Sequence, residues 1–117
     1  MKLTRRLALE ITRELWEWLA ETGKFKHEWK GWKKYGDMLS NCPLCEYAKQ
    51  HDVEVYCLTC PLFGKWIARD KSICISEGSP FDLWLGADKI EERKRYAQMI
   101  VALCKTELKI LDETEIR

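Results

Sequence analysis

Two segments of the chain, one near each end, repeat apolar residues at the spacing of an amphipathic helix. In residues 4–22, apolar side chains recur every three or four positions between charged ones, at Leu7, Ile11, Leu15, Trp18 and Leu19. Thr4 can cap the start of this helix, and Gly23 is suited to its end. Trp16 lies beside the apolar stripe and is not assigned to the buried face. The pattern predicts a helix from Thr4 to Thr22.

A longer apolar stripe occupies residues 88–111. Its members are Ile90, Ala97, Val101, Cys104, Leu108 and Leu111. The pattern predicts that the longest helix runs from Asp88 to about Leu111, with residues 112–117 frayed. Each predicted helix has one apolar face to bury, so we expect the two to pack against each other.

Shorter elements are expected between these helices. Residues 46–51 can form one helical turn, and Asp52 to Tyr56 alternates valine with acidic residues, as a short strand does. Ser79-Pro80-Phe81-Asp82 is typical of a helix start, with Ser79 as N-cap and Asp82 reaching back, and this helix is expected to stop near Gly86. The sequence predicts a mainly α fold, with small α+β as the alternative. A single domain, residues 1–117, is expected, with a central cysteine-rich zinc knot across two long terminal helices.

Cysteines are concentrated in the middle of the chain. Cys42-Pro-Leu-Cys45, Cys57-Leu-Thr-Cys60 and Cys74 all fall within residues 42–74. A C-x2-C turn directs two thiolates at one metal ion at about 2.3 Å, and two such turns complete a tetrahedral site. We therefore expect these residues to bind a metal ion.

Zinc is the expected metal, with iron as its main competitor, because paired C-x2-C turns in a reducing compartment are more often metal sites than disulfides. The simplest ligand set is Cys42, Cys45, Cys57 and Cys60. Cys74 can replace Cys57 in it, so four of the five cysteines are expected to ligate and the fifth is left unassigned. His51 is the only histidine candidate, and five thiols make it unnecessary.

Catalysis is not expected. A zinc ion held by four thiolates has no open position for a water molecule, which a hydrolytic zinc site requires. A redox role for the two dithiols is the weaker interpretation, because the βαβ context of thioredoxin-like sites is missing from the pattern. No nucleotide-binding or hydrolase motif occurs either.

Charge and aromatic residues single out one further segment. The net charge is +1, but residues 1–34 hold nine Lys or Arg against five acids, for +4. Residues 24–36 interleave five lysines with four aromatic residues. One interpretation packs the rings on the core with the lysines as a solvated rim. The other is a contact surface for a protein or a nucleic acid, made of Trp29, Trp32, Lys33, Lys34 and Tyr35.

The order of these motifs resembles a known class of proteins. Trp-Glu-Trp-Leu-Ala at 16–20, Cys-Pro-Leu-Cys-Glu-Tyr at 42–47, Cys-Leu-Thr-Cys-Pro-Leu at 57–62, Cys74 and Ser-Pro-Phe-Asp-Leu-Trp at 79–84 are similar to small cysteine-rich proteins of bacteriophages and prophages. The resemblance covers nearly the whole chain and brings no assigned activity with it. It implies one metal-linked cysteine unit, packed with the turn at 79–84.

The resemblance also implies a role in a bacterial host. The leading expectation is a non-enzymatic accessory protein that binds a host protein or nucleoprotein and inhibits a host defence system. A small zinc-containing DNA- or RNA-binding regulator is one alternative. A structural homodimer that pairs its last helix through Val101, Cys104 and Leu108 is the other, so a monomer and a homodimer both stay open. The N-terminus lacks the apolar block of a secretory signal and no apolar run is long enough to span a membrane, so the host cytoplasm is the expected location.

Overall fold

The computed structural model describes residues 1–51 and 56–115 and contains helices, turns and irregular segments but no strand within those ranges. The elements in chain order are α1 (Arg5–Thr22), η1 (Lys26–Glu28), α2 (Trp32–Tyr35), η2 (Leu39–Asn41), α3 (Pro43–His51), α4 (Tyr56–Thr59), α5 (Pro80–Gly86) and α6 (Ile90–Glu115), the η elements being 3₁₀ turns. The mainly α prediction is confirmed. Of the strand predicted over Asp52 to Tyr56, residues 52–55 lie outside the described residues and Tyr56 begins α4.

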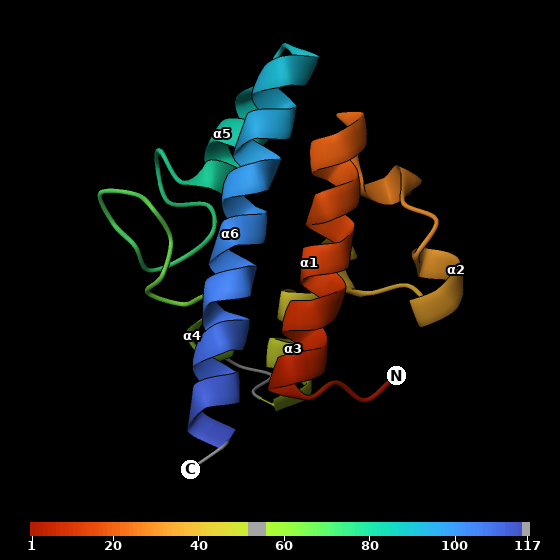
Figure 1. Cartoon of the computed structure of the whole chain (residues 1–117), viewed down its shortest axis with the longest axis vertical. Coiled ribbons are helices and arrows are strands. Elements are labelled where there is room, and N and C mark those ends of the chain that lie inside the picture. Colours follow the sequence, from red (N-terminus) through yellow and green to blue (C-terminus); the bar gives the residue numbers. More distant parts are fainter. Residues whose placement is uncertain (52–55, 116–117) are drawn as a thin grey trace.

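Helices α1 and α6 lie side by side and form the frame of the molecule (Figure 1). The Thr4 hydroxyl oxygen accepts a hydrogen bond from the Leu7 amide at 3.1 Å, which caps the start of α1. At the other end Gly23 adopts φ +70° and donates to the Leu19 carbonyl, as helix C-caps commonly do. Both predicted ends of this helix are confirmed, because the capping residues act within a single turn of backbone.

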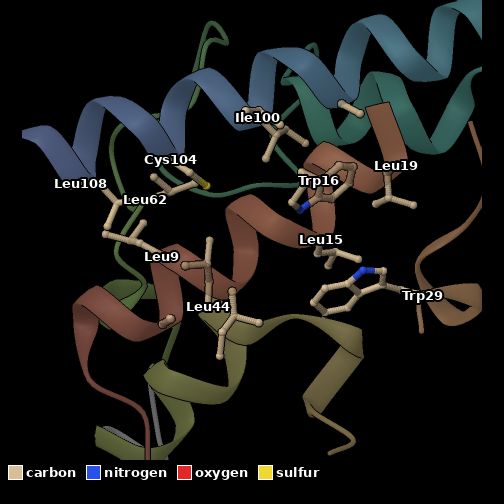
Figure 2. Packing of buried hydrophobic residues seen from close by; sticks show 14 of the residues in the cluster. Leu9, Leu15, Trp16, Leu19, Trp29, Leu44, Leu62, Ile100, Cys104 and Leu108 are labelled. Carbon is tan, nitrogen blue, oxygen red and sulfur yellow. The ribbon is translucent and has the colours of Figure 1, made fainter. Parts of the chain in front are cut away.

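Helix α1 is buried on two sides, by α6 and by α3, and this alters the predicted buried face (Figure 2). Trp16, which the stripe left unassigned, is only 5% exposed, whereas Trp18 is only partly buried. The predicted apolar stripe assumed that α1 packs against one helix, and it is too narrow because α1 packs against two. The core around α1 includes Leu9, Leu15, Leu19, Leu44, Leu62, Ile100 and Cys104.

Helix α6 is the longest and extends to Glu115, so the predicted fraying from residue 112 is wrong for residues 112–115. Val101, Cys104 and Leu108 are buried in the core that α6 shares with α1. This face is therefore covered within one chain.

The end of α1 and the start of α6 are in close contact. The Arg93 guanidinium donates a hydrogen bond to the Gly23 carbonyl at 2.9 Å, across 70 residues of sequence. A Cβ at Gly23 would lie 2.5 Å from Cγ2 of Ile90, so a larger residue here would displace the Ile90 side chain and would also be strained by the φ of +70°. Ile90 itself is 49% exposed, which corrects its assignment to the buried stripe.

Helix α5 packs on α6 and begins as predicted. The Ser79 hydroxyl oxygen accepts a hydrogen bond from the Asp82 amide at 3.1 Å, and Pro80 occupies the first turn. The Asp82 carboxylate accepts from the Gly78 amide at 2.9 Å, so it reaches one residue further back than a capping box requires. The predicted end near Gly86 is also confirmed.

No helix within the described ranges is both long enough and apolar enough to cross a membrane.

Candidate metal centre

Three separate parts of the middle of the chain bring all five clustered thiols to one pocket of about 300 Å³. Cys42 directly precedes α3, and Cys45 lies in the first turn of that helix. Cys57 belongs to α4 and Cys60 follows it. Cys74 comes from residues 60–79, which form turns and bends without a helix. All five clustered cysteines, Cys74 among them, therefore line one pocket.

A second, smaller space of about 30 Å³ is lined by Cys45, Cys57, Cys60 and Cys74. All four of these cysteines also line the larger pocket, whereas Cys42 lines only the larger one.

The first C-x2-C turn has the hydrogen bonding of a metal-binding knuckle. The Cys45 amide donates to the Cys42 sulfur at 3.4 Å, which is within reach for a sulfur acceptor. The Cys45 thiol also donates to this sulfur, and together with the nearby Lys26 ammonium and the backbone amides of Cys45 and Leu44 it lowers the pKa of Cys42 to about 6. The pKa of Cys45 is raised in turn, first by this hydrogen bond and then by burial. Cys42 is accordingly the thiol of this turn that ionises first.

The other thiols differ in their exposure to solvent. Burial raises the pKa of Cys60 to about 12 and that of Cys74 to about 11. Both are only partly exposed, whereas Cys57 is exposed. Neighbouring thiols add to each of these shifts, because a thiolate disfavours a second negative charge close to it. A cation that neutralises this charge would remove the cause of the mutual repulsion.

The wall of the pocket is mostly apolar, and its polar members besides the thiols are Ser40, Asn41 and one cation, Lys26. Trp16, Trp66, Phe81 and Ile100 line it. Lys26 also lines the pocket, with its ammonium 3.0 Å from the Ser40 carbonyl oxygen and 4.7 Å from the centre of the Phe81 ring. The ammonium lowers the pKa of Cys42 and opposes the rise at Cys74. Lys26 therefore offsets part of the charge that a set of thiolates would carry.

The donor set fits a thiolate-bound metal ion, because soft sulfur ligands are those of closed zinc sites and of iron–sulfur centres. Among the residues that the structure describes, no three His, Cys, Asp or Glu side chains are already drawn together closely enough to hold an ion. Zinc at about 2.3 Å from each sulfur requires sulfurs about 3.8 Å apart. Zinc binding would therefore require some of these sulfurs to move closer together.

Two side chains attach the cysteine segment to the helical frame. The Ser79 hydroxyl is fully buried and donates a hydrogen bond to the Cys74 carbonyl oxygen. Arg5, in the first turn of α1, donates to the Pro61 carbonyl oxygen at 3.1 Å and lies 3.9 Å from the Glu107 carboxylate of α6. The helix-start motif at Ser79 signalled the first tether. Nothing in the sequence pattern signalled the second tether or the position of Lys26, because both join segments distant along the chain.

The histidines and the sixth cysteine lie apart from the pocket. Cys104 is fully buried on α6, and burial raises its pKa to about 12. His51 is exposed, packs on the Tyr47 ring at 4.2 Å and contacts the Tyr47 carbonyl oxygen through Nδ1. His27 is exposed and stacks on Phe25. Neither histidine lines the pocket.

Three rings of the segment of alternating lysines and aromatic residues lie inward, those of Trp29, Trp32 and Tyr35, whereas Phe25 is exposed. Trp29 is 9% exposed, and Trp32 and Tyr35 pack around it at ring distances of 5.0 and 5.9 Å. The Trp32 indole donates to the Lys26 carbonyl oxygen at 2.8 Å, and the Tyr35 hydroxyl donates to the Glu14 carboxylate at 2.6 Å. The arrangement favours the structural interpretation for the rings.

The neighbouring lysines, in contrast, face solvent. Lys33 and Lys34 of α2 are exposed, and the Lys34 ammonium lies 4.9 Å from the centre of the Tyr35 ring. The part of the predicted contact surface that a partner could reach is therefore its lysine edge.

Comparisons of the chain with known protein families, with curated proteins and with solved structures found no match.

Proposed function

We propose that the protein is a small non-enzymatic binding protein whose central segment is fixed in place by a zinc ion held by four cysteine thiolates. The observation that carries this proposal is the convergence of Cys42, Cys45, Cys57, Cys60 and Cys74, from three parts of the chain, on a single pocket. A closed four-thiolate site supplies stability and leaves no position for a reacting water molecule.

Zinc would contribute most where the chain has least structure of its own. Residues 60–79 contain no helix, and their apolar side chains Phe63, Ile67 and Ile75 are largely exposed. Thiolate-bound structural zinc contributes about 10–16 kcal/mol of apparent binding free energy in small domains at neutral pH. That exceeds the net stability of many domains, so the metal ion would decide whether this segment is ordered.

The metal is tested by measuring the zinc and iron content of protein purified under reducing conditions, followed by cobalt substitution. We expect one zinc per chain. Cobalt in its place should give a tetrahedral spectrum with strong sulfur-to-cobalt charge transfer, because its intensity rises with the number of Co–S bonds. Iron with visible absorption and acid-labile sulfide would assign an iron–sulfur centre instead. Protein that holds neither metal and gives no cobalt–thiolate absorption would refute the proposal.

The binding function is proposed to lie on the lysine edge of α2. Its rings are held by packing and by hydrogen bonds to Lys26 and Glu14, so Lys33 and Lys34 are displayed from an ordered support. An acidic surface of a host protein or nucleoprotein is the partner that this charge would recognise. The resemblance to phage-encoded proteins supports a bacterial host as the source of that partner, and inhibition of a host defence system as the consequence of binding.

The binding proposal is tested with charge-reversal variants in place of ring removal, because Trp29 belongs to the core and its loss would damage the fold. Affinity purification from the bacterial host, with mass spectrometry, compares wild type with the double variant Lys33→Glu/Lys34→Glu. Lys105→Glu/Lys109→Glu, on the exposed side of α6, is the matched control. A partner kept by wild type and control and lost by the α2 variant supports the proposal. A partner retained by all three proteins refutes it, and a purified complex that weakens steeply with salt and contains only nucleic acid favours the regulator alternative.

A further inference from the structure

The pocket offers five thiols to an ion that takes four, so one cysteine is in excess. Four of the five, Cys42, Cys45, Cys60 and Cys74, are only partly exposed, whereas Cys57 is exposed. The buried Ser79 hydroxyl donates a hydrogen bond to the Cys74 carbonyl oxygen and so holds the backbone of Cys74 beside the other thiols. Cys74 therefore has the enclosed surroundings of a ligand rather than those of the spare thiol.

Cys42 and Cys57 differ in their surroundings. Cys42 is partly buried, and its sulfur accepts the Cys45 amide at 3.4 Å, a hydrogen bond that stabilises a thiolate in a fixed position. The ammonium of Lys26 lines the same pocket and supplies a compensating charge. Cys57 is exposed, yet it lines both spaces beside Cys60 and Cys74. Cys42 thus has the features of a permanent ligand, and Cys57 those of a thiol that solvent and metal can reach together.

We infer, on the basis of the proposed zinc binding, that Cys42, Cys45, Cys60 and Cys74 hold the metal ion and that Cys57 is an exchange ligand at the rim of the pocket. This set is the one that the sequence left open as the alternative, in which Cys74 replaces Cys57. The exchange role gives the exposed fifth thiol a function in how quickly the metal enters and leaves.

The exchange step involves no oxidation. One zinc–sulfur bond would break, and the released thiolate would take up a proton from solvent. The Cys57 thiol would lose its proton to solvent and its sulfur would take the vacated position, so that zinc would again have four sulfur ligands. The ion is now held partly at the rim, where an incoming chelator or thiol can displace the remaining ligands one at a time.

The experiment compares Cys57→Ser with Cys74→Ser in the full chain, using zinc alone as the probe. Zinc stoichiometry and Kd are measured by competition, and the rate of zinc transfer to a chromophoric chelator is measured by stopped flow. Cys57→Ser should keep one zinc per chain with an unchanged Kd and should transfer zinc severalfold more slowly than wild type. Cys74→Ser should lose tight binding. A cobalt spectrum that is the same for wild type and Cys57→Ser would show independently that the number of Co–S bonds has not changed.

Other results would overturn the inference. Loss of zinc from Cys57→Ser, retention of tight zinc binding by Cys74→Ser, or an unchanged transfer rate in Cys57→Ser each contradicts it. Alkylation gives a check that does not depend on mutation: with zinc bound, a maleimide should label Cys57 first among the clustered cysteines, as read by peptide mass spectrometry. Wild-type protein that binds no zinc would instead refute the proposed function itself, which separates the two failures.

Discussion

Replacement of Ser79 by alanine removes two interactions made by one fully buried hydroxyl. As N-cap of α5 this oxygen accepts from the Asp82 amide at 3.1 Å, and a Ser-to-Ala change at such a position costs about 0.5–2 kcal/mol. The same hydroxyl donates to the Cys74 carbonyl oxygen, and an acceptor left without a partner costs about 1–3 kcal/mol. The sum predicts a loss of about 1.5–5 kcal/mol in the free energy of unfolding.

Thr4→Ala is the matched control, because Thr4 caps α1 through the Leu7 amide but is exposed and tethers nothing else. It should cost about 1 kcal/mol or less. Urea denaturation of both variants, each with EDTA and with excess zinc, measures the difference. Ser79→Ala should also raise the Kd for zinc by about tenfold, if roughly 1.4 kcal/mol of the tether goes into positioning Cys74, whereas Thr4→Ala should leave it unchanged. Equal losses of stability in the two variants would refute the second hydrogen bond, and an unchanged zinc Kd in Ser79→Ala would refute its link to the metal centre.

Three further changes test other parts of the structure. Leu15→Ala, at a position with no exposed surface, should lower the free energy of unfolding by about 2–5 kcal/mol in urea denaturation, and a loss below 1 kcal/mol would contradict its place in the core. Lys26→Gln should weaken zinc binding in a chelator competition, because the amide can still reach Ser40 but no longer offsets thiolate charge, whereas Lys26→Arg should bind nearly as wild type does. Tyr35→Phe removes the hydrogen bond to Glu14 and should cost about 1 kcal/mol or less at neutral pH. That hydrogen bond raises the pKa of Tyr35 above its ordinary value of 10.0, so its stabilisation is complete below this value and is lost as the pH rises through the folded-state pKa. The unfolding temperature should therefore fall more steeply with rising alkaline pH for wild type than for Tyr35→Phe. Parallel curves of unfolding temperature against pH would argue against the hydrogen bond.

The long helices and their ends could be predicted because their causes are local. Apolar spacing identifies α1 and α6, and Thr4, Gly23 and Ser79 act on backbone groups within a few residues. The first helix of the cysteine segment was placed too late, since α3 begins at Pro43 inside the C-x2-C turn. The C-x2-C spacing predicts a turn at Cys42–Cys45, but it does not reveal that a helix starts within this turn.

Which aromatic side chains are buried could not be predicted from the apolar pattern of a single helix. Trp16 is buried because α1 touches both α3 and α6, and Trp29 is buried because Trp32 and Tyr35 close around it. For the metal centre, spacing predicted that the cysteines converge. That Cys74 lines the same pocket depends on the path of residues 60–79. This segment has no periodic pattern from which its path could be predicted.

The position of the frame helices at opposite ends of the chain has a consequence for biosynthesis. Cys42 to Cys74 are synthesised before α6, the helix that packs on α1. At roughly 5–20 residues per second, the stretch from Cys74 to Glu115 takes a few seconds to synthesise. During that interval the first cysteines of the cluster would emerge without α6 beside them, and metal ions and oxidants would compete for their thiols. Under the proposed zinc binding, the order of translation would thus give the cysteine segment a short period for taking up zinc before α6 packs on the core.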